Sequence, residues 1–347
     1  MGLCCSENKG GGNQENLVNR NENEEKKFEM INKIQLDKSN GEIYKVYELS
    51  DNNRIAVELE KSIKIYSLKN FKLITEINDD NNIGTSIELK NKDIALTRYC
   101  SVKFYKLSGN NYIFSQKISE EGELFEIYEL KNENLITCSR RQISIYSKDK
   151  GDYKILSKIE LEESVGGLFE IKNNILSLFL LSRCDSYLTA DYSPYFLQII
   201  DFENKKICEL NQDNFSYYDN DEIYCDCNFI KKENKYLFAK YAGYFDIYNI
   251  ENIDKIILIF RLNAKENKID DYKCLVNGKI FDYDDDNLIE LSRNNIYKYD
   301  EKLKKIILVK KINFEFGIEE IINIKKIRNN KYYVAYNKNE IVIIKSL

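Results

Sequence analysis

The stretch Ser62–Leu68, which reads SIKIYSL, returns as Ser101–Leu107, which reads SVKFYKL, and again as Gln142–Ser147, which reads QISIYS. Polar and apolar side chains alternate in each copy, and β-branched and aromatic residues fill the apolar positions, as in a half-buried β-strand. Each copy lies between two further alternating segments at similar distances. The sequence therefore predicts a repeat of about forty residues built from β-strands.

The strands on either side of these three copies align as well. Those before them span residues 55–57, 94–96 and 135–137, and those after them span 71–77, 112–118 and 153–159. Later sets vary in loop length but keep the order of strands, and they span residues 175–210, 236–260, 288–312 and 320–347. Clusters of Asn, Asp, Lys and Gly separate the strands, as turns require. The chain therefore contains seven sets.

The seventh set stops before its fourth strand, whereas Phe28–Leu36 reads as a single strand ahead of the first set. Pairing that strand beside the C-terminal one would complete a seventh four-stranded unit and close a ring, which hides sheet edges. The predicted fold class is all-β, a seven-bladed β-propeller over residues 28–347 whose last blade is closed by the N-terminal strand. A β-sandwich or a pair of small β domains is the alternative.

The third strand of several sets resembles the apolar-x-apolar-Trp-Asp segment of WD-repeat proteins. Ile63–Leu68, Val102–Leu107 and Phe245–Ile250 carry Tyr in place of Trp, and Leu197–Asp201 keeps the Asp alone. The chain has no His, so it lacks the Gly-His dipeptide and the His-containing hydrogen-bond network of that family. The resemblance extends over nearly the whole chain after Lys27. It implies a propeller that acts as a platform for protein–protein interaction.

The first six residues match the M-G-x-x-x-[ST] pattern, which marks Gly2 for myristoylation, with Ser6 at the hydroxyl position. One myristoyl chain holds a bilayer only marginally, so stable attachment needs a second signal. Acids and bases nearly balance over residues 7–27, so Cys4 and Cys5, as sites of S-palmitoylation, are the candidates. We therefore expect a flexible acylated tail over residues 1–27 and a protein held at the cytoplasmic face of a membrane.

The composition argues against an enzyme. Without His the chain lacks the commonest general base, the commonest metal ligand and every Ser-His or Cys-His nucleophile pair. Cys225 and Cys227 have no second pair at zinc-site spacing, and the acidic cluster Asp282, Asp284, Asp285 and Asp286 departs from the calcium-loop pattern. We expect no cofactor and no metal. The net charge of −5, with bases scattered among acids, argues against nucleic acid as a partner.

Arginine is the rarer basic residue, and its positions are informative. Five arginines follow the second strand of a set, at the turn into the third: Arg98, Arg140, Arg141, Arg183 and Arg293. In a propeller these turns gather on one rim, where a ring of guanidinium groups would suit phosphate or carboxylate recognition. The other interpretation is that they are solvated turn residues.

The function that the sequence favours is a non-enzymatic, membrane-tethered propeller scaffold that binds other proteins, because rigid blades can hold variable loops. The alternative is a propeller that binds phosphoinositides or phosphopeptides through the arginine-bearing turns. In that case the lipid anchor would add avidity to binding of anionic lipid or an acidic peptide.

Overall fold

The computed structural model describes residues 28–36, 41–79, 83–139, 142–161, 164–172, 175–181, 196–201, 206–210, 228–232, 235–241, 244–252, 257–263, 280–282, 287–290, 295–311, 321–327 and 332–346. Every regular element in these ranges is a β-strand. They contain no helix of the length and apolar character needed to cross a membrane.

The described strands form seven four-stranded antiparallel sheets, numbered blade 1 to blade 7. Blade 1 contains β2 (Ile43–Glu48), β3 (Arg54–Leu59), β4 (Ser62–Ser67) and β5 (Leu73–Asn78). Blade 2 contains β6 (Ser86–Glu88), β7 (Ile94–Arg98), β8 (Ser101–Ser108) and β9 (Asn111–Ser119). Blade 3 contains β10 (Leu124–Glu129), β11 (Leu135–Ser139), β12 (Gln142–Asp149) and β13 (Asp152–Glu160).

The other four blades repeat this order. Blade 4 contains β14 (Ser164–Lys172), β15 (Ile175–Leu181), β16 (Phe196–Asp201) and β17 (Lys206–Leu210). Blade 5 contains β18 (Asn228–Lys232), β19 (Tyr236–Tyr241), β20 (Tyr244–Asn249) and β21 (Ile257–Asn263). Blade 6 contains β22 (Ile280–Asp282), β23 (Asn287–Glu290), β24 (Asn295–Asp300) and β25 (Lys305–Lys311). Blade 7 contains β26 (Asn323–Ile327), β27 (Tyr332–Tyr336), β28 (Glu340–Ser346) and the N-terminal β1 (Phe28–Gln35).

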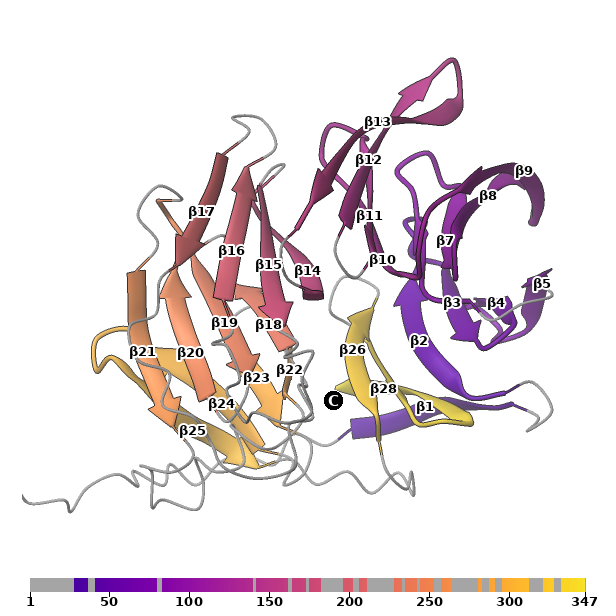
Figure 1. The fold of residues 1–347 in the computed structure, drawn as a ribbon. Helices are drawn as coiled ribbons and strands as arrows, with labels where there is room; N and C mark the ends of the chain where they lie inside the picture. Colours follow the sequence, from indigo (N-terminus) through magenta and orange to yellow (C-terminus); the bar gives the residue numbers. More distant parts are fainter. Residues whose placement is uncertain are drawn as a thin grey trace, which may run out of the picture.

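Blade 7 closes the ring as the sequence predicts. Its strand order is β1-β28-β27-β26, and β1 runs antiparallel to β28 from Phe28 opposite Ser346 to Gln35 opposite Glu340. In Figure 1 the blades follow one another around the molecule in chain order, so that the indigo β1 and the yellow β28 lie side by side. The seven-bladed propeller closed by the N-terminal strand is therefore confirmed, and the alternative of a sandwich or two separate domains is wrong.

The core lies between the blades. Each cluster of buried apolar side chains draws on two neighbouring blades: blades 7 and 1, 1 and 2, 2 and 3, 3 and 4, 5 and 6, and 6 and 7 among the described residues. Isoleucine dominates these clusters, because a β-branched side chain packs well on the pleated face of a sheet. Every blade therefore depends on its neighbours for burial.

The repeated third-strand tyrosine has a structural counterpart in five blades. A shift in register between the third and fourth strands falls directly before it, at Tyr66, Tyr105, Tyr146, Tyr248 and Tyr297. All five tyrosines are buried. A β-bulge adds one residue to a strand and increases its twist. The outermost strand of each of these blades is therefore bent at the same place.

Candidate functional site

A buried acid joins blade 1 to blade 2. Asp79 directly follows β5, and its side chain is fully buried. Its carboxylate pairs with the guanidinium of Arg98 and lies 2.9 Å from Lys103 Nζ. It also accepts a hydrogen bond from the hydroxyl of Tyr105 at 3.4 Å. The cationic groups compensate for the desolvation of the carboxylate, since a buried charge is tolerated only when it is paired.

The same arrangement recurs one blade further on. Glu120 directly follows β9 and accepts a hydrogen bond from the hydroxyl of Tyr146, while Lys158 Nζ lies 3.2 Å from its other oxygen. The hydroxyls of Thr137 and Tyr146 lie 3.2 Å apart. Burial, followed by the contact with Glu120, raises the pKa of Tyr146. Acid–tyrosine pairs between neighbouring blades are thus present in a chain that has no His.

Arg98 follows the second strand of its set as the sequence indicates, but its side chain does not face solvent. The residue is buried, and its guanidinium is held by Asp79. At this turn Tyr99 is the exposed residue, with 71% of its surface accessible, and Cys100 is exposed beside it. The structure therefore provides no free guanidinium here for an external anion.

The other predicted site residues lie outside the described ranges. They are Arg140, Arg141, Arg183 and Arg293 of the arginine-bearing turns, and Gly2, Cys4 and Cys5 of the anchor. Cys225, Cys227, Asp284, Asp285 and Asp286 also lie outside, whereas Asp282 ends β22. Within the described residues no three Cys, Asp or Glu side chains are grouped as metal ligands would be.

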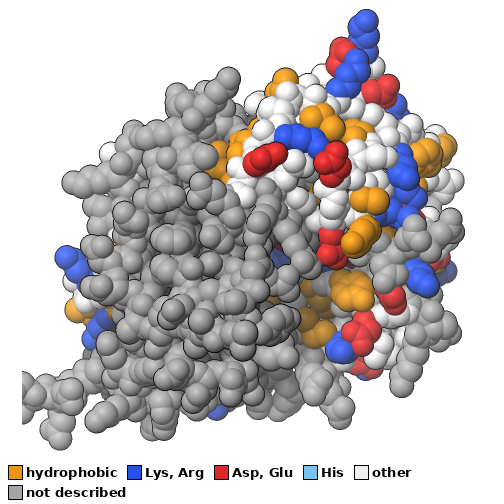
Figure 2. All heavy atoms as spheres, viewed as in Figure 1, with side chains coloured by type: hydrophobic (Ala, Val, Ile, Leu, Met, Phe, Trp, Pro, Cys, Tyr) orange, Lys and Arg blue, Asp and Glu red, His pale blue; other side chains and the backbone are white. Residues whose placement is uncertain are grey.

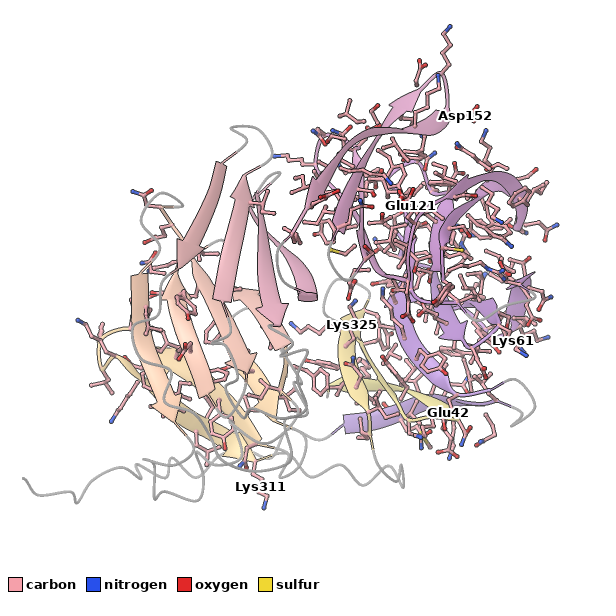
Figure 3. All side chains as sticks on the ribbon, viewed as in Figure 1. Glu42, Lys61, Glu121, Asp152, Lys311 and Lys325 are labelled. Atoms are coloured by element: carbon pink, nitrogen blue, oxygen red, sulfur yellow. The ribbon has the colours of Figure 1, made fainter. Side chains whose placement is uncertain are left out.

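The surface that stands out instead is on the outer hairpins of blades 2 and 3. The hairpins β8–β9 and β12–β13 are long and tightly turned, with Gly109, Lys150 and Gly151 in the left-handed region at their tips. Such positive φ angles are typical of two-residue hairpin turns. Figure 1 shows β12–β13 projecting beyond the other blades, and Figure 3 places Asp152 at its far end.

Apolar side chains are exposed on these hairpins. Phe114 on β9 and Ile155 on β13 lie opposite the repeated tyrosines of their blades, as Leu73, Leu258 and Leu308 do in three others. All five are exposed. Blades 2 and 3 add Ile113 and Leu156, and we group the four exposed apolar residues of these two hairpins, Ile113, Phe114, Ile155 and Leu156, under the name outer apolar patch. Phe114 is 53% exposed and Leu156 60%. Figure 2 shows hydrophobic side chains exposed among charged ones over this part of the molecule.

The outer apolar patch is rigidly supported. The side-chain amide of Gln116 on β9 donates to the carbonyl oxygen of Tyr153 on β13 at 2.8 Å and accepts from its N–H at 3.0 Å. The ring of Tyr153 stacks on that of Phe104 with centroids 4.7 Å apart. Phe114 meets the ring of Tyr105 edge-on at 5.9 Å. The two hairpins therefore present their exposed side chains from one connected support.

Exposed apolar groups on a rigid support suit binding rather than catalysis. Exposed apolar patches on soluble proteins mark surfaces for partners, and aromatic anchors contribute much of the affinity at such interfaces. Sequence reasoning missed the patch, because the bulge in β13 breaks the alternation there and leaves both Ile155 and Leu156 exposed.

Comparison with known proteins identifies the fold and nothing finer. No protein-family model matches the chain, and no curated protein matches it in sequence. Among solved structures, the crystal structure of the Cps50 (Swd1) β-propeller domain from Myceliophteria thermophila is similar. The similarity covers 92% of this chain and 100% of that one at a TM-score of 0.64 and 10% sequence identity. The chain thus has a β-propeller fold that resembles the propeller domain of Cps50 (Swd1).

Proposed function

We propose that this chain is a non-enzymatic scaffold that holds partner proteins on its propeller and is tethered to a membrane by its N-terminal tail. The observation that carries the first half is the outer apolar patch, in which four exposed side chains rise from two hairpins tied together by Gln116. Preorganised side chains lose little entropy on binding, so such a surface binds without first having to order itself.

The proposed tether rests on Gly2, Cys4 and Cys5, which match the pattern for two acyl chains. The tail would leave the propeller at Phe28, where β1 begins in blade 7. The outer apolar patch belongs to blades 2 and 3. A partner bound there and a membrane holding the tail would therefore engage different blades.

The scaffold is tested by cross-linking in the cells that express the protein. Full-length protein carrying Phe114→Ser and Leu156→Ser should lose specific cross-linked partners. Leu308→Ser is the matched control, because Leu308 occupies the equivalent outer-strand position on blade 6 and is similarly exposed. Unchanged melting temperatures establish that folding is intact. If both variants keep the wild-type set of partners, the patch is not the binding surface.

The tether is tested separately by fractionation. Gly2→Ala should release the protein from membranes, and Cys4→Ser with Cys5→Ser should leave it bound only weakly, since one acyl chain is marginal and two are stable. Full membrane retention of Gly2→Ala would contradict the lipid anchor without affecting the proposed binding surface.

A further inference from the structure

A surface cavity of about 140 Å³ lies where blade 7 meets blade 1, and we term it the closure pocket. Three of its lining residues, Leu68, Ile327 and Ile343, are buried in the cluster between the two blades. Its rim consists of Ile31, Lys69, Phe71 and Tyr332, which are partly or fully exposed. The pocket is therefore largely apolar and open to solvent, with one cationic side chain at its edge.

Two backbone irregularities meet at this rim. The register of β1 against β28 shifts between Met30 and Asn32, which makes Ile31 the extra residue of a bulge. Phe71 has a φ of 59°, in the left-handed region that bulky side chains rarely adopt, and its N–H donates to the carbonyl oxygen of Ser67 at 2.8 Å. Bulges redirect side chains, and strained backbone of this kind is concentrated at functional sites.

We propose that the closure pocket binds the end of the myristoyl chain carried by Gly2; this rests on the lipid anchor proposed above. One side of the pocket is formed by β1, the strand that directly follows the tail, because the lining residue Ile31 lies three residues after Phe28. Phe28 lies 26 positions after Gly2, and a chain of that length spans up to about 90 Å when fully extended. The acyl group therefore reaches the pocket without strain.

The size of the pocket makes this binding partial and reversible. A cavity of about 150 Å³ binds benzene, so the closure pocket holds about six carbon atoms. Each buried methylene strengthens binding about fourfold, so a pocket that takes about six carbon atoms binds the acyl chain more weakly than a bilayer that takes all of it. A myristoyl chain binds bilayers with a constant of about 10⁴ M⁻¹. The tail makes binding to the pocket intramolecular, and accessible membrane withdraws the acyl chain from the pocket.

The test uses full-length protein in which an N-myristoyltransferase has acylated Gly2 and Cys4→Ser and Cys5→Ser exclude palmitate. The chain has no Trp, so Lys69→Trp places a single fluorophore at the pocket rim. Without vesicles, we expect its emission to be shifted to the blue relative to the same protein carrying Gly2→Ala. Neutral phosphatidylcholine vesicles should reverse that shift.

A second measurement uses the chain without the fluorophore. Ile31→Phe should fill the pocket and raise binding of the acylated protein to neutral vesicles, because the competing site is lost. Met30→Phe is the matched control, since Met30 is exposed on the same strand and does not line the pocket. Equal emission with and without the acyl chain, together with vesicle binding unchanged by Ile31→Phe, would overturn the proposal.

Two further outcomes are distinguishable. The emission of the acylated protein and of Gly2→Ala could be equally blue, and Leu17→Asp could shift both to the red. That result would show that a tail side chain occupies the pocket, and the acyl assignment would be wrong. The intact mass of the protein from its own cells tests the lipid anchor alone. An unmodified Gly2 there removes the anchor, while the enzymatically acylated protein still decides whether the pocket binds an acyl chain.

Discussion

Asp79 and Arg98 form a buried ion pair across the junction of two blades, although the sequence places them in separate turns. The acid follows the outermost strand of blade 1, and the base ends the second strand of blade 2. The pair therefore links the residue after the outermost strand of blade 1 to the end of the second strand of blade 2.

Asp79→Asn should destabilise the propeller by about 3–5 kcal/mol, because it removes the carboxylate that pairs with the buried Arg98 and the half-buried Lys103. Urea unfolding of the full-length protein measures the change. Asp149→Asn is the control, since Asp149 forms an exposed pair with Lys154 on the β12–β13 hairpin and should alter stability little. Equal effects of the two substitutions would contradict the structural role of the buried acid.

Gln116→Leu should loosen the β12–β13 hairpin without unfolding the ring. It removes two hydrogen bonds to the backbone of Tyr153, together worth about 1–3 kcal/mol. Hydrogen exchange should therefore speed up at the amide of Tyr153 and stay unchanged in blades 5 and 6. Ser157→Ala on the same strand serves as the control. If the exchange rate at Tyr153 is the same in Gln116→Leu, Ser157→Ala and the wild type, Gln116 does not tie the hairpins together.

The Glu58 carboxyl should make stability fall as pH rises through the weakly acidic range. Burial raises its pKa, against the opposing effects of Lys45 and of the hydroxyl of Ser86, which donates to it at 2.6 Å. Above the usual value of 4.5, the folded protein retains a proton that the unfolded chain has lost, so stability declines up to the raised pKa.

Glu58→Gln should remove that part of the pH dependence. Above the raised pKa of Glu58 the variant should be more stable than the wild type, and below pH 4.5 its stability should approach that of the wild type. Unfolding curves recorded from pH 4 to pH 8 measure the difference. Glu121→Gln, at an exposed carboxylate, should leave the wild-type profile unchanged. A profile for Glu58→Gln that parallels the wild type throughout would rule out Glu58 as its source.

Removing residues 28–36 should destabilise the ring and cause aggregation, because the edge of β28 loses its partner. Removing residues 7–20 should leave the melting temperature within about a degree of the wild type, since that deletion lies wholly in the tail before β1. Light scattering and thermal unfolding compare the two. Equal behaviour would contradict closure by the N-terminal strand.

The strands could be predicted from sequence because alternation and turn residues are local signals. β24 (Asn295–Asp300) and β27 (Tyr332–Tyr336) lie within the predicted sets 288–312 and 320–347. The three-residue β6 is too short for periodicity to reveal. Closure of the ring could be predicted because the last set lacks a fourth strand and Phe28–Leu36 stands alone before the first set. Pairing the two completes the last blade, as β1 and β28 do in the structure.

The partners of buried charges could not be predicted in this way. Arg98 reads as a turn residue, and nothing near it in the chain indicates that Asp79 neutralises it. One signal did exist: Asp79 precedes Tyr105 by 26 residues, and Glu120 precedes Tyr146 by the same 26. An acid at the same distance before both of these tyrosines predicts contact between neighbouring blades once the propeller is assumed.

The pairing of β1 with β28 also sets the order of events during translation. β1 leaves the ribosome first, yet its partner follows about 300 residues later, which at 5–20 residues per second is a delay on the order of tens of seconds. Until then the nascent chain carries an unpaired strand and an open last blade. A product truncated anywhere before Glu340 lacks β28 and keeps β1 unpaired for good, so the ring cannot close until β28 has been made.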